Sequence, residues 1–325
     1  MNTRTRQAIR LTALLICGAA ALVSAARAAD GAALNGESFS FARDLSSEAV
    51  IRGFDLPCSS FQIWGDFYVG KGDIDPKGTE RSFDNELTGA QIGLNWGLGP
   101  GMLATAYYNY QSAELSEGTR FTDQAQTHLG GFGLRYNTGG FYFSLLGTAG
   151  LDDYELTGSG VDGALGCDGW QAGGSLETGY YMRTGGLFTL KPFGNLQYSY
   201  MKSDGIDLNS LSLKEEKFKA DALFQTLGAR IDAELGFATL QARFGWVHQY
   251  LKSAPIQTYW FSRTPGTYTP AQAFFEGSTG TDHFWGGAGV KFSLFGTIAA
   301  NLDYDVLFNS RQTTHMASAG LLWSF

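Results

Sequence analysis

The chain has 325 residues, of which 44% are hydrophobic and 17% are charged, and its formal net charge is −8. A net acidic chain lacks the basic footprint of nucleic-acid-binding proteins, so we exclude nucleic acid as a partner. Three cysteines are too few for a disulfide scaffold. The chain contains 44 glycines, 24 Phe, 15 Tyr and 7 Trp but only 7 prolines, and its mean hydropathy is −0.11. This composition suits strands, tight turns and the aromatic girdles of a membrane barrel.

The chain begins with an export signal. Three arginines precede the apolar run LTALLICGAAALVSA, and Ala26 and Ala28 then form a small-x-small cleavage pattern. We therefore predict a signal peptide over residues 1–28; a short membrane anchor is the alternative. Its removal takes away four arginines and no acidic residue, so the net charge changes from −8 to −12. No later segment has the roughly 18 apolar residues of a membrane helix, so a membrane location would require a barrel.

Residues 29–60 form a short extension between the predicted cleavage point and the first strand. A segment below about 40 residues cannot fold alone without disulfides or metals. Its centre, SFARDLSSEAVIRGFD, is typical of a short helix capped by Ser46 or Ser47 before Glu48. The segment is long enough to cross a pore of about 30 Å. A pore plug and a disordered periplasmic tail both remain open.

From residue 61 onward, apolar and polar residues alternate with a period of two, which indicates strands with one apolar and one polar face. In IAANLDYDVLFNS, for example, Leu302 and Tyr304 alternate with Asp303 and Asp305. The predicted strands span residues 61–70, 86–98, 101–113, 121–137, 140–152, 168–184, 187–202, 218–235, 238–252, 280–295, 297–310 and 315–325. Such alternation fits either a soluble sandwich or a barrel with an apolar exterior and a polar lumen.

The connections favour the barrel. Every second connection is tight and glycine-rich, such as NTGGF and RTGGLF, whereas most of the others are long and polar, such as KGDIDPKGTERSFDN. Short turns on one rim and long loops on the other are typical of outer-membrane barrels, in which the short turns are periplasmic. We therefore predict an all-β fold, a 12-stranded antiparallel transmembrane β-barrel over residues 61–325.

The carboxy-terminal half carries a family resemblance. The last strand, AGLLWSF, contains Trp323 and closes on the aromatic residue Phe325, which resembles the assembly signal of bacterial outer-membrane barrels. Residues 168–325 resemble the autotransporter β-domain, the translocator of type V secretion. In that stretch, LETGYYMRTGGLFTLKPFGNLQYSY is similar to the family's Glu-x-Gly-Tyr strand and its following L-x-P…L-x-Y strand. GGAGVKFSL and LDYDVLFNS are similar to its closing strands.

The resemblance implies a Gram-negative-type outer-membrane protein that exports an amino-terminal passenger and keeps a linker in its pore. Its expected partners are outer-membrane lipids, the barrel assembly machinery and periplasmic chaperones; we expect a monomer without cofactors. Residues 29–60 contain no solenoid repeat and no protease or lipase motif. The leading hypothesis is therefore a surface-anchoring translocator with little or no passenger. The alternatives are a plugged structural barrel, a channel or a loop-mediated adhesin, and an outer-membrane hydrolase at the outer rim.

Strand alternation also predicts which charged residues face the lumen. The inward positions are Glu177, Arg183, Lys191, Arg230, Asp232, Arg243, Lys291, Asp303 and Asp305. Because the signs are mixed, they do not form an ion-selective ring of one charge. Buried charges need partners, so we expect Glu177 and the pair Asp303 and Asp305 to meet arginines across the lumen.

The family resemblance implies a role for these lumen positions. It implies that Glu177, Arg230 and Arg243 contact the linker, and we group Asp303 and Asp305 with them as lumen residues of the same site. Charges that only pair strand to strand are the alternative.

Catalytic candidates lie at the predicted outer rim. His283 follows Asp282, His128 lies near Asp123, and His315 follows Ser310. A nucleophile and its base must lie within hydrogen-bond reach, which these spacings do not establish, so we predict no enzyme activity and no catalytic residues. No nucleotide-binding or EF-hand spacing occurs, and we predict no metal site.

The two cysteines of the exported chain are expected on opposite rims. Cys58 precedes the first strand and Cys167 lies in the third outer loop, which would separate them by about 30 Å. Because a disulfide requires Cα atoms within about 7 Å, we predict no intrachain disulfide.

Overall fold

The structure is a computed structural model that describes residues 61–74, 83–117, 121–158, 165–184, 186–203, 207–208, 213–214, 218–253, 257–264, 267–274, 282–294, 297–309 and 312–325. The predictions for residues 1–28, for residues 29–60 and for Cys58 lie outside this part of the chain.

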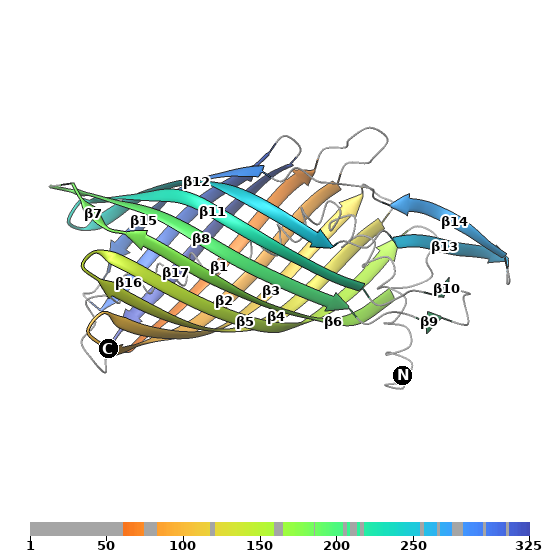
Figure 1. The fold of residues 1–325 in the computed structure, drawn as a ribbon, viewed down its shortest axis with the longest axis horizontal. Helices are drawn as coiled ribbons and strands as arrows, with labels where there is room; N and C mark the ends of the chain where they lie inside the picture. The colour runs from red at the N-terminus through yellow and green to blue at the C-terminus, as the bar shows by residue number, and fades with distance from the viewer. Residues whose placement is uncertain are drawn as a thin grey trace.

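Among the described residues, twelve long antiparallel strands close into a barrel (Figure 1). They are β1 (Phe61–Ile74), β2 (Phe83–Gly99), β3 (Met102–Glu117), β4 (Phe121–Thr138), β5 (Phe141–Gly158), β6 (Leu165–Tyr180), β8 (Phe188–Ser203), β11 (Phe218–Glu234), β12 (Ala238–Ser253), β15 (Asp282–Ser293), β16 (Ile298–Phe308) and β17 (Gln312–Ser324). Each strand pairs with its neighbours in chain order, and β1 pairs with β17 to close the sheet. The predicted fold is therefore confirmed, and each predicted span overlaps one of these strands.

The two rims differ as the connections predict. Tight turns join β2 to β3 and β4 to β5, where Gly101, Gly139 and Gly140 adopt positive φ angles that favour glycine. The opposite rim carries the longer connections. There the sequence analysis missed two small hairpins, β9 (Asp207–Leu208) with β10 (Leu213–Lys214), and β13 (Gln257–Thr264) with β14 (Thr267–Phe274). The β13–β14 hairpin projects beyond this rim (Figure 1).

One predicted strand is interrupted. The span 168–184 ends as β6 at Tyr180, and a two-residue strand, β7 (Met182–Arg183), resumes pairing with β8 after a break at Tyr181. The prediction of a continuous strand to residue 184 is wrong in this detail. The break lies beside the turn that leads to β8, where the strand end has a partner on one side only.

The exterior is apolar and the interior is polar. On β2, Ile92 and Leu94 face outward and are 58% and 47% exposed, whereas the inward Gln91 and Asn95 are 4% and 0% exposed. This inverted arrangement decides between the two folds that the alternation left open, because a soluble sandwich buries its apolar face. No helix among the described residues is long and apolar enough to cross a membrane.

Aromatic side chains of the inner face pack against glycines of the neighbouring strand. A Cβ atom added to Gly93 would lie 2.3 Å from a ring carbon of Trp64, and one added to Gly131 would lie 2.2 Å from a ring carbon of Tyr107. In each case the glycine is the direct cross-strand partner of the aromatic residue. Glycine is therefore required here by close approach, and the large ring fills the space that the missing side chain leaves.

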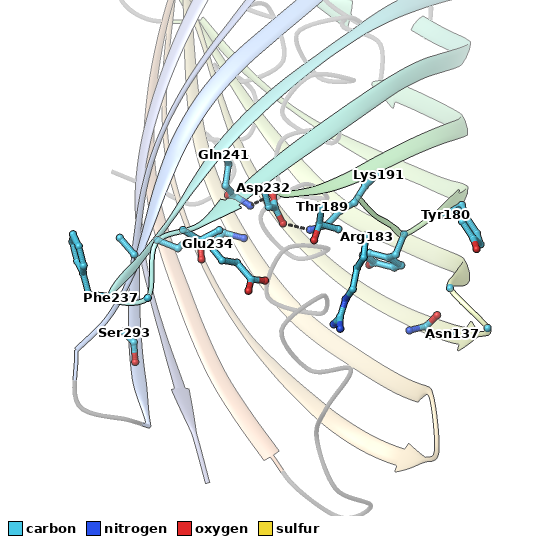
Figure 2. A pocket seen from close by; sticks show the side chains of 17 residues that line it. Asn137, Tyr180, Arg183, Thr189, Lys191, Asp232, Glu234, Phe237, Gln241 and Ser293 are labelled. Carbon is cyan, nitrogen blue, oxygen red and sulfur yellow. Dashed lines mark hydrogen bonds and ion pairs between the residues drawn. The ribbon is translucent and has the colours of Figure 1, made fainter. Parts of the chain in front are cut away.

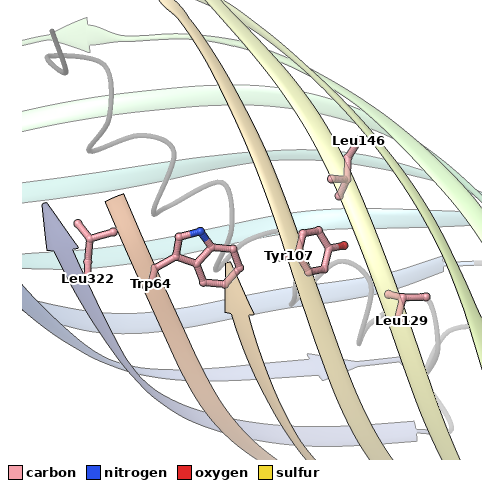
Figure 3. Close-up of a cluster of buried hydrophobic side chains, with 5 residues drawn as sticks. All are labelled: Trp64, Tyr107, Leu129, Leu146 and Leu322. Atoms are coloured by element: carbon pink, nitrogen blue, oxygen red, sulfur yellow. The ribbon is translucent and has the colours of Figure 1, made fainter. Parts of the chain in front are cut away.

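Two of these rings belong to an apolar cluster within the barrel. Its buried members are Trp64, Tyr107, Leu129, Leu146 and Leu322 (Figure 3). They come from five strands that are neighbours around the barrel or one strand apart, β17, β1, β3, β4 and β5. The sequence analysis assigned the lumen to polar residues and did not anticipate this cluster. The sequence contains a signal for this cluster, because strand alternation places Trp64 on the inner face of its strand, with Phe61, Ile63 and Phe67 on the outer face.

Candidate functional site: the lumen of the barrel

The inner face of the barrel has two chemically different walls. We define the neutral wall by seven of the buried, uncharged side chains of β1 to β3: Trp64, Tyr68, Gln91, Asn95, Tyr107, Asn109 and Gln111. The charged wall comprises the buried Asp, Glu, Lys and Arg side chains of β6, β8, β11, β12, β15 and β16: Glu177, Lys191, Arg230, Asp232, Arg243, Lys291, Asp303 and Asp305. Eight of the nine charged positions predicted to face the lumen thus lie in the charged wall.

Arg243 on β12 links the two aspartates of β16. Its Nε and Nη2 atoms donate to the two carboxylate oxygens of Asp305, at 2.7 and 2.6 Å. Its Nη1 atom lies 3.0 Å from Oδ1 of Asp303. A forked guanidinium satisfies two carboxylates in this way because it presents several donors in one plane. The guanidinium therefore neutralises much of the negative charge at the centre of the charged wall.

Two glycines on β15 make room for these aspartates. Gly287 pairs with Asp305 and Gly289 pairs with Asp303. A Cβ atom on either glycine would lie 2.0 Å from the Oδ1 atom of its partner. The glycines at positions 287 and 289 are thus explained by the carboxylates that lie over β15, between β16 and Arg243.

Glu177 forms the second predicted pair. Nη2 of Arg230 lies 3.9 Å from Glu177 Oε2, and the hydroxyl of Tyr142 donates to Glu177 Oε1 at 2.9 Å. The guanidinium of Arg230 also lies over the ring of Phe193, 4.7 Å from its centre. Both predicted pairings form, but they run along the wall over one intervening strand and not across the open diameter. The distance between the strands explains this, because a side chain spans the gap to a strand two places away more readily than the gap to the opposite wall.

A cavity of about 740 Å³ opens at the tight-turn rim of the charged wall (Figure 2). Lys191 Nζ pairs with Asp232 Oδ2 there, and the side-chain amide of Gln241 donates to Asp232 Oδ1 at 2.9 Å. Lys291 and Arg183 also line the cavity. Buried charges of both signs thus surround a space that is open at the rim.

Arg183 lies at the mouth of the lumen. The residue is in β7, after the break at Tyr181, and its exposed side chain lines the cavity. Its cross-strand partner is Thr189, which lies two residues before the inward Lys191, so Arg183 keeps the inward direction that strand alternation predicts. Among the nine charged positions, Arg183 is the one that is not buried.

Some buried charges were missed. Arg135 on β4 is 2% exposed, lies over the ring of Tyr142 at 4.1 Å, and donates to the Tyr181 hydroxyl at 2.5 Å. Asp152 on β5 accepts from Thr127 Oγ1 and from Gln171 Nε2, both at 2.7 Å. Alternation within β4 and β5 places both residues inward, so the sequence signal was present for each.

The histidines considered as catalytic candidates lie apart from the acidic residues next to them in the sequence. His283 faces the lumen, is 1% exposed and contacts Asn309 Nδ2 through Nδ1 at 3.1 Å. Asp282 faces the exterior and instead contacts Nδ1 of His248, at 2.8 Å. Adjacent residues of a strand point to opposite faces, so Asp282 and His283 do not form a catalytic pair.

The other two histidines also lie on the exterior. His315 contacts the hydroxyl of Tyr304 through Nδ1 at 2.7 Å, and His128 contacts that of Tyr108 at 2.5 Å. The proposed neighbour Ser310 lies outside the described residues, and the side chain of Asp123 is not described. Within the described part of the chain, no group of three or more His, Cys, Asp or Glu side chains is placed to hold a metal ion.

The last strand ends with two exterior aromatic rings. Trp323 and Phe325 are 50% and 58% exposed, and their ring centres are 4.5 Å apart. The backbone N–H of Phe325 donates to the carbonyl of Phe61 at 2.9 Å. Both ends of the barrel therefore meet at the tight-turn rim, as an even number of strands requires. The role of Trp323 and Phe325 as an assembly signal stays a prediction.

The sequence profile of the Autotransporter beta-domain matches residues 63–305, which is most of the barrel. The chain belongs to the autotransporter β-domain family. Members of this family are outer-membrane proteins, so the apolar exterior of this barrel faces outer-membrane lipid. The architecture then places the tight-turn rim in the periplasm and the long-loop rim outside the cell.

Solved translocator structures share this fold. The translocator domain of autotransporter NalP from Neisseria meningitidis is 16% identical, with a TM-score of 0.67, and the match covers 90% of this chain and 98% of that one. The β-domain of the Bordetella autotransporter BrkA is 18% identical, with a TM-score of 0.64 over 82% and 100% of the two chains. The transport unit of AIDA-I from Escherichia coli is 10% identical, with a TM-score of 0.63 over 83% and 92%. At these identities the likeness concerns the fold alone.

A curated relative is much longer. An extracellular serine protease of Serratia marcescens is 27% identical over 156 residues, which is 46% of this chain and 14% of that protein. The chain thus spans about one seventh of the length of this relative.

Proposed function

We propose that this barrel is the translocator unit that carries the segment preceding β1 to the cell surface and anchors it there. The observation that supports this proposal is the closed barrel with its charged wall. Phe61 begins β1 at the periplasmic rim, beside the carboxy-terminal Phe325. A segment that precedes β1 therefore starts on the periplasmic side, and the proposed route to the outside is through the lumen.

The charged wall is the proposed contact surface for that segment. Glu177, Arg230, Arg243, Asp303 and Asp305 are buried and form ion pairs along the wall. A polypeptide carries backbone donors and acceptors together with side chains of both charges, so a wall with both signs offers it partners at many registers. A wall of one sign would favour ions of the opposite sign.

Residues 29–60 are the proposed occupant of the lumen after export, which makes them a plug. This segment contains five acidic and two basic residues. The cavity at the periplasmic mouth contains Arg183, Lys191 and Lys291 against Asp232 and Glu234, so its net charge is positive. The two charges are complementary. Residues 1–28 are the proposed signal peptide that delivers the chain to the periplasm.

Surface exposure of an epitope at Asn35 tests export. In intact cells, an externally added protease should remove the epitope. An epitope in the turn at Gly139 and Gly140 is the matched control and should stay protected until the outer membrane is opened. If the epitope at Asn35 is also cleaved only in opened cells, export is ruled out.

Conductance in planar bilayers tests the plug. Deletion of residues 29–58 should raise the single-channel conductance of the purified barrel because the proposed occupant of the lumen is gone. The exchange Arg230→Met in the full chain should loosen the plug and increase brief openings. An unchanged conductance after the deletion would favour a plugged structural barrel that is closed by its own loops.

The proposal gives the barrel no catalytic role and no cofactor. At the rim candidate, Asp282 contacts His248 at the exterior and the neighbouring His283 is buried in the lumen, so these two residues are not assigned a catalytic role. The assembly machinery and periplasmic chaperones are the proposed partners during insertion, with Trp323 and Phe325 as their recognition signal. A His283→Ala variant that lost a measurable hydrolytic activity of the purified chain would revive the hydrolase hypothesis.

A further inference from the structure

The apolar cluster on the inner wall is covered from the lumen side. Its members are between 2% and 9% exposed, although they stand on the inner face of the barrel: Trp64, Tyr107, Leu129, Leu146 and Leu322 (Figure 3). Wall side chains fill the interior of a barrel of about eight strands, but a barrel with more strands is wider. In this twelve-stranded barrel, burial to this degree therefore indicates an occupant of the lumen beside the cluster.

Polar groups beside the cluster are also available to such an occupant. The hydroxyl of Tyr107 and the side-chain amide of Gln91 are buried and have no hydrogen-bond partner within the described part of the chain. Gln91 lies two residues before Gly93 on the same face of β2, and Gly93 is the cross-strand partner of both Trp64 and Tyr107. Because a buried polar atom without a partner is costly, these groups favour a partner that lies in the lumen.

The charged wall is less suited to hold a resting segment. Arg243 already contacts Asp303 and Asp305, and Lys191 already pairs with Asp232. An occupant that used these charges would compete with the existing buried pairs, and breaking such pairs is destabilising. A segment in passage can contact this wall briefly, whereas a lasting contact is better provided by the apolar cluster.

The segment that precedes β1 carries a matching apolar face. In the helix predicted for SFARDLSSEAVIRGFD, Phe41, Leu45 and Ala49 are spaced by four residues and therefore share one face. Ser40 and Ser47 lie on the opposite face of the same helix. This predicted helix thus has an apolar stripe about two turns long, which can cover a cluster of similar extent.

The stripe and the cluster also agree in depth. Trp64 and Leu146 lie three and five residues after the starts of β1 and β5 at the periplasmic rim, which is roughly 10 and 17 Å along the strands. A helix that ends at this rim near Asp55 places Ala49 and Leu45 roughly 9 and 15 Å inside the barrel. The chain continues from this helix directly into β1, so the segment enters the lumen beside the strand that carries Trp64.

We propose that the apolar cluster is the seat of the plug. The face formed by Phe41, Leu45 and Ala49 packs against the cluster and keeps the segment in the lumen after export. This inference rests on the proposed plug and names the surface that holds it. The charged wall then contacts the segment during its passage, and the apolar cluster holds it at rest.

Disulfide cross-linking of the full chain locates the seat. In a background with Cys58→Ser and Cys167→Ser, Leu45→Cys should form a disulfide with Leu146→Cys on mild oxidation. It should form none with Gln241→Cys, a buried inward position on β12, the strand six places around the barrel from β3 of the cluster. Mass mapping under non-reducing conditions detects the bond, and heat-modifiable mobility in SDS gels shows that each variant is folded.

Single-channel recording in planar bilayers measures how firmly the segment is held. Leu45→Gln removes an apolar side chain from the contact, so the open fraction should rise about tenfold or more. Ser40→Gln introduces the same side chain on the opposite face of the predicted helix and should leave the open fraction unchanged. The chain without residues 29–58 is the fully open reference.

Two results would overturn the inference while the plug itself stands. One is a folded barrel in which Leu45→Cys forms no disulfide with Leu146→Cys. The other is an equal open fraction for Leu45→Gln and Ser40→Gln although deletion of residues 29–58 raises the conductance. In either case the plug is held elsewhere. If the deletion leaves the conductance unchanged, the plug proposal fails, and this inference fails with it.

Discussion

The neutral wall and the charged wall are built by the same packing device from different chemistry. In the neutral wall, the ring of Trp64 occupies the space over Gly93. In the charged wall, the carboxylate of Asp305 occupies the space over Gly287. In both walls, a side chain of one strand thus lies over a glycine of the next strand. The two walls differ in the free-energy cost of removing one interaction partner.

In the neutral wall the interactions are ordinary hydrogen bonds. Trp64 Nε1 donates to Asn95 Oδ1 at 3.2 Å, and the hydroxyl of Tyr68 donates to Asn109 Oδ1 at 2.9 Å. Each such bond contributes about 0.5–1.5 kcal/mol to stability. In the charged wall, removing one ion leaves a buried charge of the opposite sign, which costs much more. The charged wall is therefore the more sensitive half of the lumen.

The largest effect is expected from Arg243→Met. The variant leaves Asp303 and Asp305 buried without their guanidinium partner, and breaking a buried pair typically costs about 3–5 kcal/mol. Urea unfolding of the barrel in detergent, followed by tryptophan fluorescence, measures the loss. Adding Asp305→Asn to Arg243→Met should restore part of the stability. A loss as small as that of a neutral hydrogen bond would mean that the two walls do not differ.

A smaller effect is expected from Gly131→Ala in the interior. The added methyl group meets the ring of Tyr107 at 2.2 Å, and such overpacking costs about 1–3 kcal/mol. Gly130→Ala is the matched control one residue away, because its methyl group points into open space. The same unfolding experiment should show a loss for the first variant and almost none for the second. Equal losses in both would contradict the assignment of Gly131 to the interior.

Tyr68→Phe tests the neutral wall with a still smaller expected effect. The change removes the hydroxyl that donates to Asn109 but keeps the ring over Gly89, so about 0.5–1.5 kcal/mol should be lost. The urea midpoint should move only slightly, without a change in slope. A loss as large as that of Arg243→Met would show that the hydroxyl holds a wider network than its contacts with Asn109 and Gln111.

The smallest effect is expected at the rim, from Lys71→Ala. The apolar exterior of β1 ends at Val69, and Lys71 lies beyond it with its Nζ atom 3.0 Å from Glu86 Oε1. The hydrogen bond and the charge of Glu86 raise the pKa of Lys71, so any contribution of the pair is present at neutral pH and lost only at strongly alkaline pH. Both side chains are exposed, and water screens the pair. The unfolding curves of the variant and the wild type should coincide at pH 7.

The local sequence pattern was sufficient to predict the barrel strands and most of the charged residues that face the lumen. Alternation placed all twelve barrel strands and the nine charges that it assigned to the inner face, because in a strand the side-chain direction follows from parity alone. Eight of these charges are buried, and the ninth, Arg183, lines the cavity at the mouth of the barrel. The β13–β14 hairpin was missed because short hairpins outside the main sheet carry a weak signal.

Contacts between strands could not be obtained in the same way. Asp282 contacts His248, which is 34 residues away, and no local pattern in the sequence indicates this contact. Likewise, parity placed Glu177 and Arg230 in the lumen but did not show that they meet over β8. Such contacts depend on strand register, and register depends on every connection around the barrel.

The amino-acid sequence by itself determined which side chains share a face of each strand, because a period of two assigns each side chain to one face, and its alternating short and long connections favoured a barrel. The tertiary structure alone decided which inward groups meet, and it divided the lumen into a neutral wall and a charged wall. The physical reason is closure: pairing β1 with β17 sets the register of all strands together, and only then do Arg243 and Asp305 come within hydrogen-bond distance.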